Sequence, residues 1–207
     1  MNRTSSIDRL RQNQINIFDR VLSRNECNRL LLSFDNRLWE RSAVMSVKDG
    51  KKLEYGYSNC RTSNSLFFPR DQFNDVLLEI TTRVVSRVKD LNPSNWEPWQ
   101  VTRYYPGQYF EPHLDSHSGD QDPEGPRTKT ILLYLQAPLE GGETYFRALN
   151  LWIKPVPGRL VVWDNLLATG NPNFAMIHSG EPVVRGIKVI LQTWQRQSNF
   201  KHSMEAL

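Results

Sequence analysis

The chain has 207 residues, a formal net charge of +4 and 39% hydrophobic residues. This length predicts one domain, and the composition excludes a disordered chain, a collagen-like chain and a disulfide scaffold. No apolar run reaches the roughly 20 residues of a membrane span. The N-terminal residues lack the apolar segment of a secretory signal. Two cysteines alone cannot build a zinc or iron–sulfur site, and they fit a reducing compartment, so we expect a cytoplasmic protein.

The positive charge is spread along the chain. Residues 1–60, 61–100, 101–150 and 151–207 carry net charges of +4, 0, −3 and +3. A protein that follows a phosphate backbone usually has a dense block of lysine and arginine. The distribution therefore disfavours a nucleic-acid partner.

Two helices are predicted in the first half of the chain. Ser23-Arg24-Asn25-Glu26 has the pattern of a capping box, which predicts a helix running to about Asn36. Apolar residues then recur at helical spacing from near Asp71 to near Leu91. Asn92-Pro93 is expected to end this second helix.

From Trp96 onward the pattern changes to short strands separated by Gly- and Pro-containing turns. The expected strands are Gln100–Tyr105, Tyr109–His113, Thr128–Gln136, Thr144–Arg147, Leu151–Lys154, Arg159–Trp163, Phe174–Ser179 and Ile187–Gln195. This spacing is typical of a sandwich or jelly roll. We expect a mainly β fold with flanking helices, as one domain over 1–207. A helical part (about 1–95) would brace a β core (about 96–196), and the polar segment 116–127 would form a loop.

His113 and Asp115 are the first candidate metal ligands. Residues two apart in a strand point to the same face, so an imidazole and a carboxylate would converge. Such a pair is a weak signal alone. His178 follows a short apolar segment far downstream, and two histidines with one carboxylate form the facial triad of non-haem Fe(II) oxygenases. Such a triad leaves about three coordination positions for a co-substrate and O2.

Lys188 follows His178 by ten residues and begins the last expected strand. It shares one face of that strand with Ile190, Gln192 and Trp194. If that face lines the barrel, the buried ammonium needs an anionic partner. The distal carboxylate of a dicarboxylic acid would supply one.

Several spaced segments carry a family resemblance. They are Cys60–Ser63, Gln100–Asp115, Thr130–Leu135, Gly141–Thr144 and His178–Lys188, followed by Trp194. In this order they resemble the prolyl 4-hydroxylases, a family of 2-oxoglutarate/Fe(II)-dependent dioxygenases. The resemblance covers about residues 15–196 and implies a double-stranded β-helix, or jelly roll, flanked by helices.

The resemblance also implies roles for single residues. The Fe(II) ligands would be His113, Asp115 and His178. The residues that bind 2-oxoglutarate would be Lys188, Tyr104 and Thr130. The residues on the substrate side would be Arg61, Arg127, Tyr109 and Trp194.

Two positions depart from the family on the substrate side. Phe110 stands where many members have tyrosine, although Tyr109 adjoins it, and Arg196 lies where some members that act on peptidyl proline have histidine. These departures leave iron and 2-oxoglutarate unaffected. They put peptidyl proline in question.

The implied activity is hydroxylation of an unactivated C–H bond of a prolyl or other amino-acid residue. Fe(II), O2 and 2-oxoglutarate would take part, with 2-oxoglutarate decarboxylated to succinate, and ascorbate would assist as reductant. The partner would be an amino acid or a peptide, with no membrane; the oligomeric state stays open.

Three alternatives remain. The first is hydroxylation of a free amino acid or small metabolite. The second is a nucleic-acid demethylase of the same superfamily, a group that usually pairs 2-oxoglutarate with arginine, whereas this chain offers Lys188. The third, a non-catalytic jelly-roll binding module, requires the two histidines and Asp115 to be a coincidence.

Overall fold

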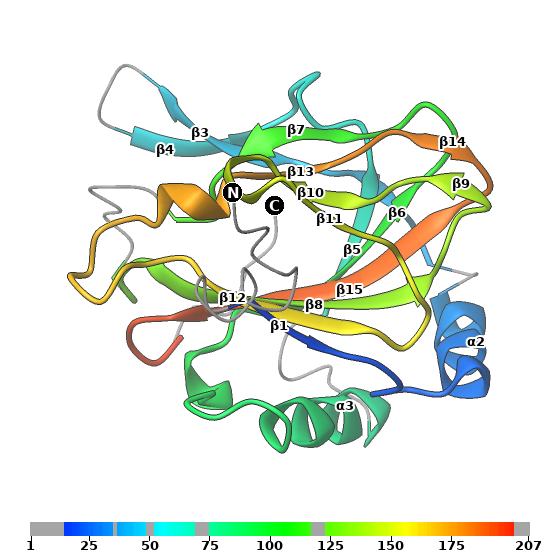
Figure 1. The fold of residues 1–207 in the computed structure, drawn as a ribbon, viewed down its shortest axis with the longest axis horizontal. Helices are drawn as coiled ribbons and strands as arrows, with labels where there is room; N and C mark the ends of the chain where they lie inside the picture. Colours follow the sequence, from blue (N-terminus) through cyan, green and yellow to red (C-terminus); the bar gives the residue numbers. More distant parts are fainter. Residues whose placement is uncertain (1–14, 35–36, 49–51, 69–74, 117–122, 201–207) are drawn as a thin grey trace, which may run out of the picture.

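The computed structural model describes residues 15–34, 37–48, 52–68, 75–116 and 123–200. Within these residues the chain forms antiparallel sheets and two α-helices (Figure 1). The predicted mainly β class with flanking helices is confirmed. None of the described helices is long and apolar enough to cross a membrane. The prediction of one domain over the whole chain stays a prediction.

A seven-stranded sheet forms the larger layer. Its strands, in spatial order, are β1 (Ile15–Phe18), β12 (Leu160–Asp164), β8 (Arg127–Gln136), β15 (Lys188–Arg196), β6 (Trp99–Tyr104), β5 (Asn64–Phe68) and β2 (Glu40–Arg41). The smaller layer has four strands, β11 (Leu151–Ile153), β10 (Thr144–Phe146), β13 (His178–Gly180) and β7 (Phe110–His113). Two strand pairs lie outside these sheets: β9 (Glu140–Gly141) with β14 (Val183–Arg185), and β3 (Val44–Lys48) with β4 (Lys52–Gly56).

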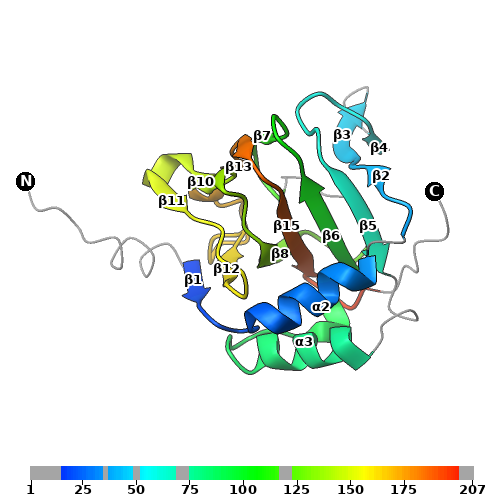
Figure 2. The ribbon, with the colours of Figure 1, turned by 90° about the vertical axis from the view of Figure 1, so that its right-hand side faces the viewer.

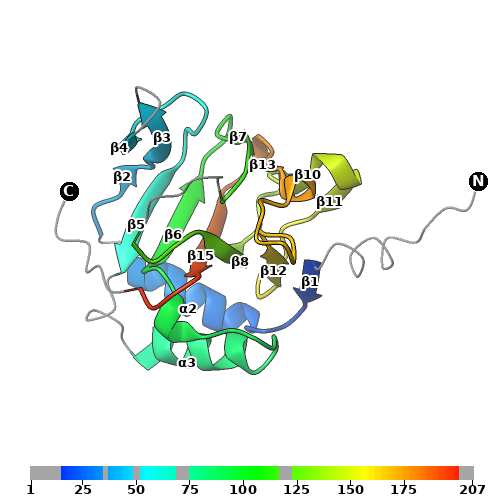
Figure 3. The same ribbon diagram turned by 90° about the vertical axis from the view of Figure 1, so that its left-hand side faces the viewer.

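The two sheets face each other, and the helices α2 (Arg24–Phe34) and α3 (Asp75–Val85) cover the outer side of the larger one (Figures 1 and 2). This is the jelly-roll arrangement, in which two antiparallel sheets enclose an interior. Figure 3 places the β3–β4 hairpin beside β2 and β5, at the end of the larger sheet away from β1.

Side chains alternate between the two faces of the central strands, so these strands contribute to two hydrophobic cores. One face of the larger sheet packs Trp99, Val101 and Leu191 against helix residues such as Ile80. The opposite face points between the sheets and contributes Tyr104, Tyr134, Trp163 and Ile190 to a second cluster. Since side chains alternate along a strand, each central strand serves both cores. The helices therefore support the sheet that carries the interior residues.

The first helix begins as the capping box predicts. The Ser23 backbone N–H donates to Glu26 Oε2 at 2.7 Å, and the Glu26 N–H donates to Ser23 Oγ at 3.3 Å. Glu26 also forms a 2.7 Å ion pair with Arg83 of α3, which joins the two helices. The second helix is shorter than predicted and ends at Val85. Turns follow it, with the Arg87 N–H donating to the Val84 carbonyl at 3.1 Å, and Asp90 then takes a left-handed conformation (φ 64°). Its predicted start near Asp71 lies outside the described residues.

The expectation of a helical N-terminal part was incomplete. Besides the helices, residues 15–68 contribute β1 to β5. β1 pairs with β12, and β5 pairs with β6, so these short strands are completed by residues far downstream. Their local sequence carries little of that information.

The predicted strand Phe174–Ser179 was also partly wrong. It begins as a 3-10 turn over Phe174–Met176, and β13 starts only at His178. The Asn173 side chain accepts from the Ala175 N–H at 3.2 Å and stabilises this turn. Of the expected loop, residues 117–122 lie outside the described part, and β8 already begins at Arg127.

We predict that Ser23→Ala lowers the free energy of unfolding by about 1 kcal/mol, because the helix loses its N-cap acceptor. Denaturant unfolding followed by circular dichroism would measure the change. Ser33→Ala is the matched control, since the Ser33 hydroxyl only donates to the Leu30 carbonyl within the same helix. Equal stability of Ser23→Ala and the wild type would contradict the prediction.

Candidate active site

The pairing of β7 with β13 brings the two candidate histidines together. His113 and His178, 65 positions apart in the sequence, are direct partners in this antiparallel pair. Their side chains therefore emerge on one face, with ring centroids 4.3 Å apart.

Asp115 completes the cluster from just beyond β7. The strand ends at His113, where the predicted strand also ends, so the alternation used to place Asp115 does not extend to it. Its carboxylate nevertheless lies near both rings, with Oδ1 3.6 Å from His113 Nε2 and Oδ2 3.8 Å from His178 Nε2. One ligand atom from each of the three residues lies within 4.8 Å of the others. The structure thus brings together the three residues expected to hold a metal.

Both imidazoles present the nitrogen that a metal needs. His113 Nδ1 lies 2.8 Å from the Glu111 carbonyl and His178 Nδ1 lies 2.9 Å from the Met176 carbonyl. Because a carbonyl only accepts, each Nδ1 carries the proton and each Nε2 lone pair faces the cluster.

The local electrostatics favour the ligating forms of the cluster. Burial, together with the neighbouring His178, lowers the pKa of His113 to about 3. Burial raises the pKa of Asp115, but the two histidines, Arg127 and a hydrogen bond from Thr130 outweigh it and bring that pKa to about 2. A neutral imidazole and an ionised carboxylate are the forms that bind a divalent ion. The donor set fits such an ion.

A pocket between the two sheets surrounds this cluster. It is lined by Tyr104, Phe110, His113, Asp115, Thr130, Leu132, Thr144, Trp163, His178, Ser179, Gly180, Lys188, Ile190, Gln192 and Trp194. Seven of the ten residues predicted from the sequence line it. The other three, Arg61, Tyr109 and Arg127, lie outside its lining.

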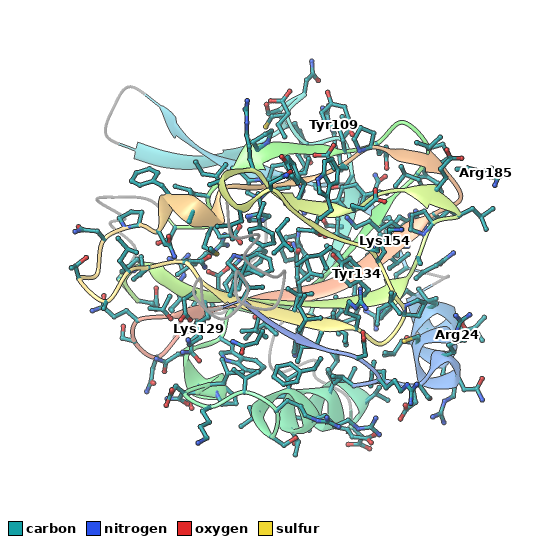
Figure 4. All side chains as sticks on the ribbon, in the orientation of Figure 1. Arg24, Tyr109, Lys129, Tyr134, Lys154 and Arg185 are labelled. Atoms are coloured by element: carbon teal, nitrogen blue, oxygen red, sulfur yellow. The ribbon has the colours of Figure 1, made fainter. Side chains whose placement is uncertain are left out.

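Lys188 places a cation inside the pocket wall. Its residue is 2% exposed, and its Nζ lies 5.0 Å from the centroid of the Tyr104 ring and 5.9 Å from that of Tyr134. Figure 4 shows Tyr134 between the two sheets. Lys188 is opposite Tyr104 in the β15–β6 pair, so both side chains share this face.

The charge of Lys188 is incompletely balanced. Burial lowers the pKa of its ammonium to about 8, although Glu143 and Glu181 oppose this change. Among the described residues, no carboxylate oxygen lies within ion-pair distance of its Nζ. A buried cation of this kind is stabilised by an anionic ligand. The pocket therefore fits a carboxylate at its Lys188 end and a metal at its histidine end.

Thr130 lies at the metal end of the pocket. Its hydroxyl donates to Asp115 Oδ2 at 2.6 Å. It was predicted to contact a co-substrate, but its one hydroxyl proton is directed to the carboxylate.

Arg127 and Arg196 meet at one buried carboxylate. Arg127 donates twice to Glu97, at 2.6 and 2.7 Å, and Arg196 Nε lies 2.6 Å from the same residue. The Arg127 guanidinium also lies 3.9 Å over the ring of Trp194, which lines the pocket. Arg127 therefore supports a pocket wall from behind.

Arg61 and Tyr109 lie on the other side of the pocket. The Arg61 guanidinium lies 4.8 Å over the Phe110 ring, which in turn stacks on His113 with centroids 3.6 Å apart. The Tyr109 hydroxyl donates to the Asn59 carbonyl at 3.2 Å, and Figure 4 shows this side chain on the outer side of β7.

A belt of buried polar side chains joins the pocket to Arg61. Gln192 Nε2 donates to Gln100 Oε1 at 2.8 Å, and Gln100 Nε2 donates to Ser65 Oγ at 2.9 Å. The hydrogen bonds continue to Arg61 through small hydroxyl groups. These belong to Ser65, Ser42, Ser63 and Thr102.

Sequence reasoning did not select Thr144, Gln192 or Asn165. Thr144 belongs to the Gly141–Thr144 segment, and Gln192 shares the face of Lys188, so both had a signal in the sequence. Thr144 Oγ1 lies 2.6 Å from the Tyr134 hydroxyl inside the pocket region. Asn165, which contacts Thr130, follows β12 and had no such signal.

Comparison with known proteins adds a family context. Residues 99–196 match the model of the 2OG-Fe(II) oxygenase superfamily. The chain is 29% identical over 191 residues to prolyl 4-hydroxylase 1 of Arabidopsis thaliana. The alignment covers 85% of this chain and 66% of that protein. It thus spans about two thirds of that relative's length.

Solved structures share the fold. The viral collagen prolyl hydroxylase of Paramecium Bursaria Chlorella virus-1, solved as a 2OG complex, superposes with a TM-score of 0.68 at 28% identity, covering 88% of this chain and 95% of that one. A prolyl hydroxylase from Trichoplax adhaerens, in complex with a peptide fragment, has a TM-score of 0.66 at 16% identity, covering 92% and 87%. The second likeness concerns the fold alone.

We predict that His113→Ala and Asp115→Ala each weaken Mn(II) binding at least about 100-fold, because three ligands become two. Isothermal titration calorimetry would measure the affinity. Glu140→Ala, which removes an exposed carboxylate on β9, is the control and should bind as the wild type does. Wild-type affinity in either ligand variant would refute the metal site.

Proposed function

Because the chain belongs to the 2-oxoglutarate–Fe(II) oxygenases and, within them, to the prolyl 4-hydroxylase-like enzymes, we propose that it hydroxylates a prolyl residue of a peptide. 2-Oxoglutarate would be converted to succinate and CO2. The observation that carries the proposal is the placing of a two-histidine, one-carboxylate cluster and a buried lysine in the same pocket.

His113, Asp115 and His178 would hold Fe(II). Iron supplies the dioxygen chemistry that an unactivated C–H bond requires. The protein holds both imidazoles in one tautomer through the Glu111 and Met176 carbonyls. The ligand atoms thus need no proton rearrangement before they bind the ion.

Lys188 would bind the distal carboxylate of 2-oxoglutarate. Its burial supports this role, because a charge–carboxylate contact is strongest where water is excluded. Tyr104, its partner across the β6–β15 pair, would stand beside the same carboxylate. These two residues would orient the co-substrate toward the metal.

The substrate side would be formed around Trp194 and Phe110. Trp194 is supported by Arg127, and Phe110 by Arg61. We propose that these residues shape the entry for a peptide, with Arg61, Arg127 and Tyr109 acting from behind or beside the pocket. The names of the relatives, which refer to prolyl hydroxylation, support proline as the target.

Two finer points belong to the same proposal. Ascorbate would act as a reductant that keeps the iron ferrous. A cytoplasmic location agrees with Cys27 and Cys60, both of which are free thiols.

A panel of substrates tests the proposed function. It contains proline-rich peptides, free proline and a methylated oligonucleotide, each with Fe(II), ascorbate and 2-oxoglutarate. We expect succinate formation coupled to a product heavier by about 16 Da, one oxygen atom, on a peptidyl proline, located by mass spectrometry. Oxidation of free proline instead, or demethylation of the oligonucleotide, would replace the proposed substrate.

The affinity for 2-oxoglutarate is predicted to depend on the charge of Lys188. Because the pKa of Lys188 is about 8, the ammonium is lost as pH rises through this value. We expect the Kd for 2-oxoglutarate to rise about tenfold between pH ~7 and pH ~9. Calorimetry on Mn(II)-loaded protein would measure it.

Lys188→Met removes the charge at similar length. This variant should bind 2-oxoglutarate weakly, with little pH dependence. Lys154→Met, which removes an exposed lysine, serves as the control and should keep the wild-type profile. The role of Lys188 would be refuted by a Lys188→Met variant with wild-type affinity.

A further inference from the structure

We infer that Thr130 and Asn165 are positioning residues for Asp115, and that Thr130 acts on the metal centre through this contact instead of binding 2-oxoglutarate. The inference rests on the proposed function, because it assumes that Asp115 is a metal ligand. It adds Asn165 to the residues that build the site.

The direction of the hydrogen bonds follows from chemistry. An ionised carboxylate only accepts, so Thr130 Oγ1 must give its single proton to Asp115 Oδ2 at 2.6 Å. Asn165 presents Nδ2 at 2.9 Å and Oδ1 at 3.2 Å to the same hydroxyl. Since the proton is committed, the nearer contact is a donation from the Asn165 amide to the Thr130 oxygen. The chain of donors therefore runs from Asn165 through Thr130 to Asp115.

Burial protects this series of hydrogen bonds from water. Thr130 and Asn165 are each 2% exposed, and the Asp115 side chain is 7% exposed. A hydrogen bond to a charged group in such a place is stronger than an exposed one. Thr130 has little freedom to turn away from Asp115, because Trp163 and Trp194 are its partners on the neighbouring strands β12 and β15.

The backbone also fixes Asn165. Its N–H donates to the Thr128 carbonyl at 2.9 Å, and its own carbonyl accepts from the Asn173 N–H at 2.8 Å. The Asn165 backbone is thus held by chain segments on both sides. It can act as a fixed support for the Thr130 hydroxyl.

Asp115 needs such a support. It lies past the end of β7, so the strand that positions His113 does not position its carboxylate. Oδ2 accepts from Thr130, and Oδ1 carries no such contact among the described residues and is the better placed oxygen for the ion. A carboxylate that offers one oxygen leaves more coordination positions for the co-substrate and O2.

Thr130→Val tests the inference, since it removes the hydroxyl and keeps the shape. We expect Mn(II) affinity to fall about 10- to 100-fold. Thr130→Ser should restore it to within about threefold of the wild type, because serine offers the same donor. Thr128→Val is the matched control on the same strand, where the hydroxyl donates only to the Gln195 carbonyl, and should bind as the wild type does.

The same variants separate the two roles of Thr130. At saturating Mn(II), the Kd of Thr130→Val for 2-oxoglutarate should change less than about threefold. An unchanged Mn(II) affinity with a weakened 2-oxoglutarate affinity would overturn the inference and return Thr130 to the co-substrate. Unchanged affinity for both would overturn it as well.

Asn165→Ala provides a second route if Thr130→Val does not fold. It should weaken Mn(II) binding about three- to tenfold, while wild-type binding would contradict the inference. His113→Ala distinguishes a failure of the proposed metal centre from a failure of the positioning role. If His113→Ala binds Mn(II) as the wild type does, the proposed metal centre fails; if it does not bind while Asn165→Ala binds normally, only the positioning role fails.

Discussion

The site depends on the pairing of one short strand with another. β7 and β13 join segments 65 positions apart, and their register makes His113 and His178 direct partners. A slip of one residue in this pair would turn one imidazole to the opposite face of the sheet. The neighbouring strand β10 adds to this constraint, because Phe146 pairs with His178 on its other side.

Electrostatics divide the pocket into two ends. The histidine end is built from two imidazoles and one carboxylate, a donor set that favours a cation. The other end holds Lys188, whose burial is unfavourable until an anion reaches it. A ligand with a carboxylate at its far end and oxygen donors at its near end satisfies both ends at once. A co-substrate of that length and charge, as proposed above, would match the pocket.

Much of the fold and of the candidate site could be predicted from the sequence, because many of the signals that indicate them are local. The His113–Asp115 spacing, the alternation from Lys188 to Trp194 and the capping box at Ser23 each occupy a few residues. The β class followed from such patterns, and the candidate metal ligands His113, Asp115 and His178 followed from the spacing together with the family resemblance. β1 and β5 did not, because their pairing depends on strands that lie far along the chain.

The support of Asp115 was hidden for the same reason. Thr130 and Asn165 are 35 positions apart, and they meet because β8 pairs with β12 in a register that no local pattern encodes. Arg127 gives a related lesson. Its position in the sequence agreed with a substrate contact, but the three-dimensional neighbour that takes its charge is Glu97.

The polar belt between Gln192 and Arg61 has a consequence for the entropy of binding. Three of its members are serines and one is a threonine, side chains with few rotatable bonds. Each is already held in one rotamer by its neighbours, so little conformational freedom remains to be lost when a substrate arrives. A flexible side chain at the place of Gln192 would have to be ordered at every binding event, at about 0.5–1.5 kcal/mol. Of the belt, Gln192 lines the pocket, and the residues behind it order its side chain during folding, before any substrate binds.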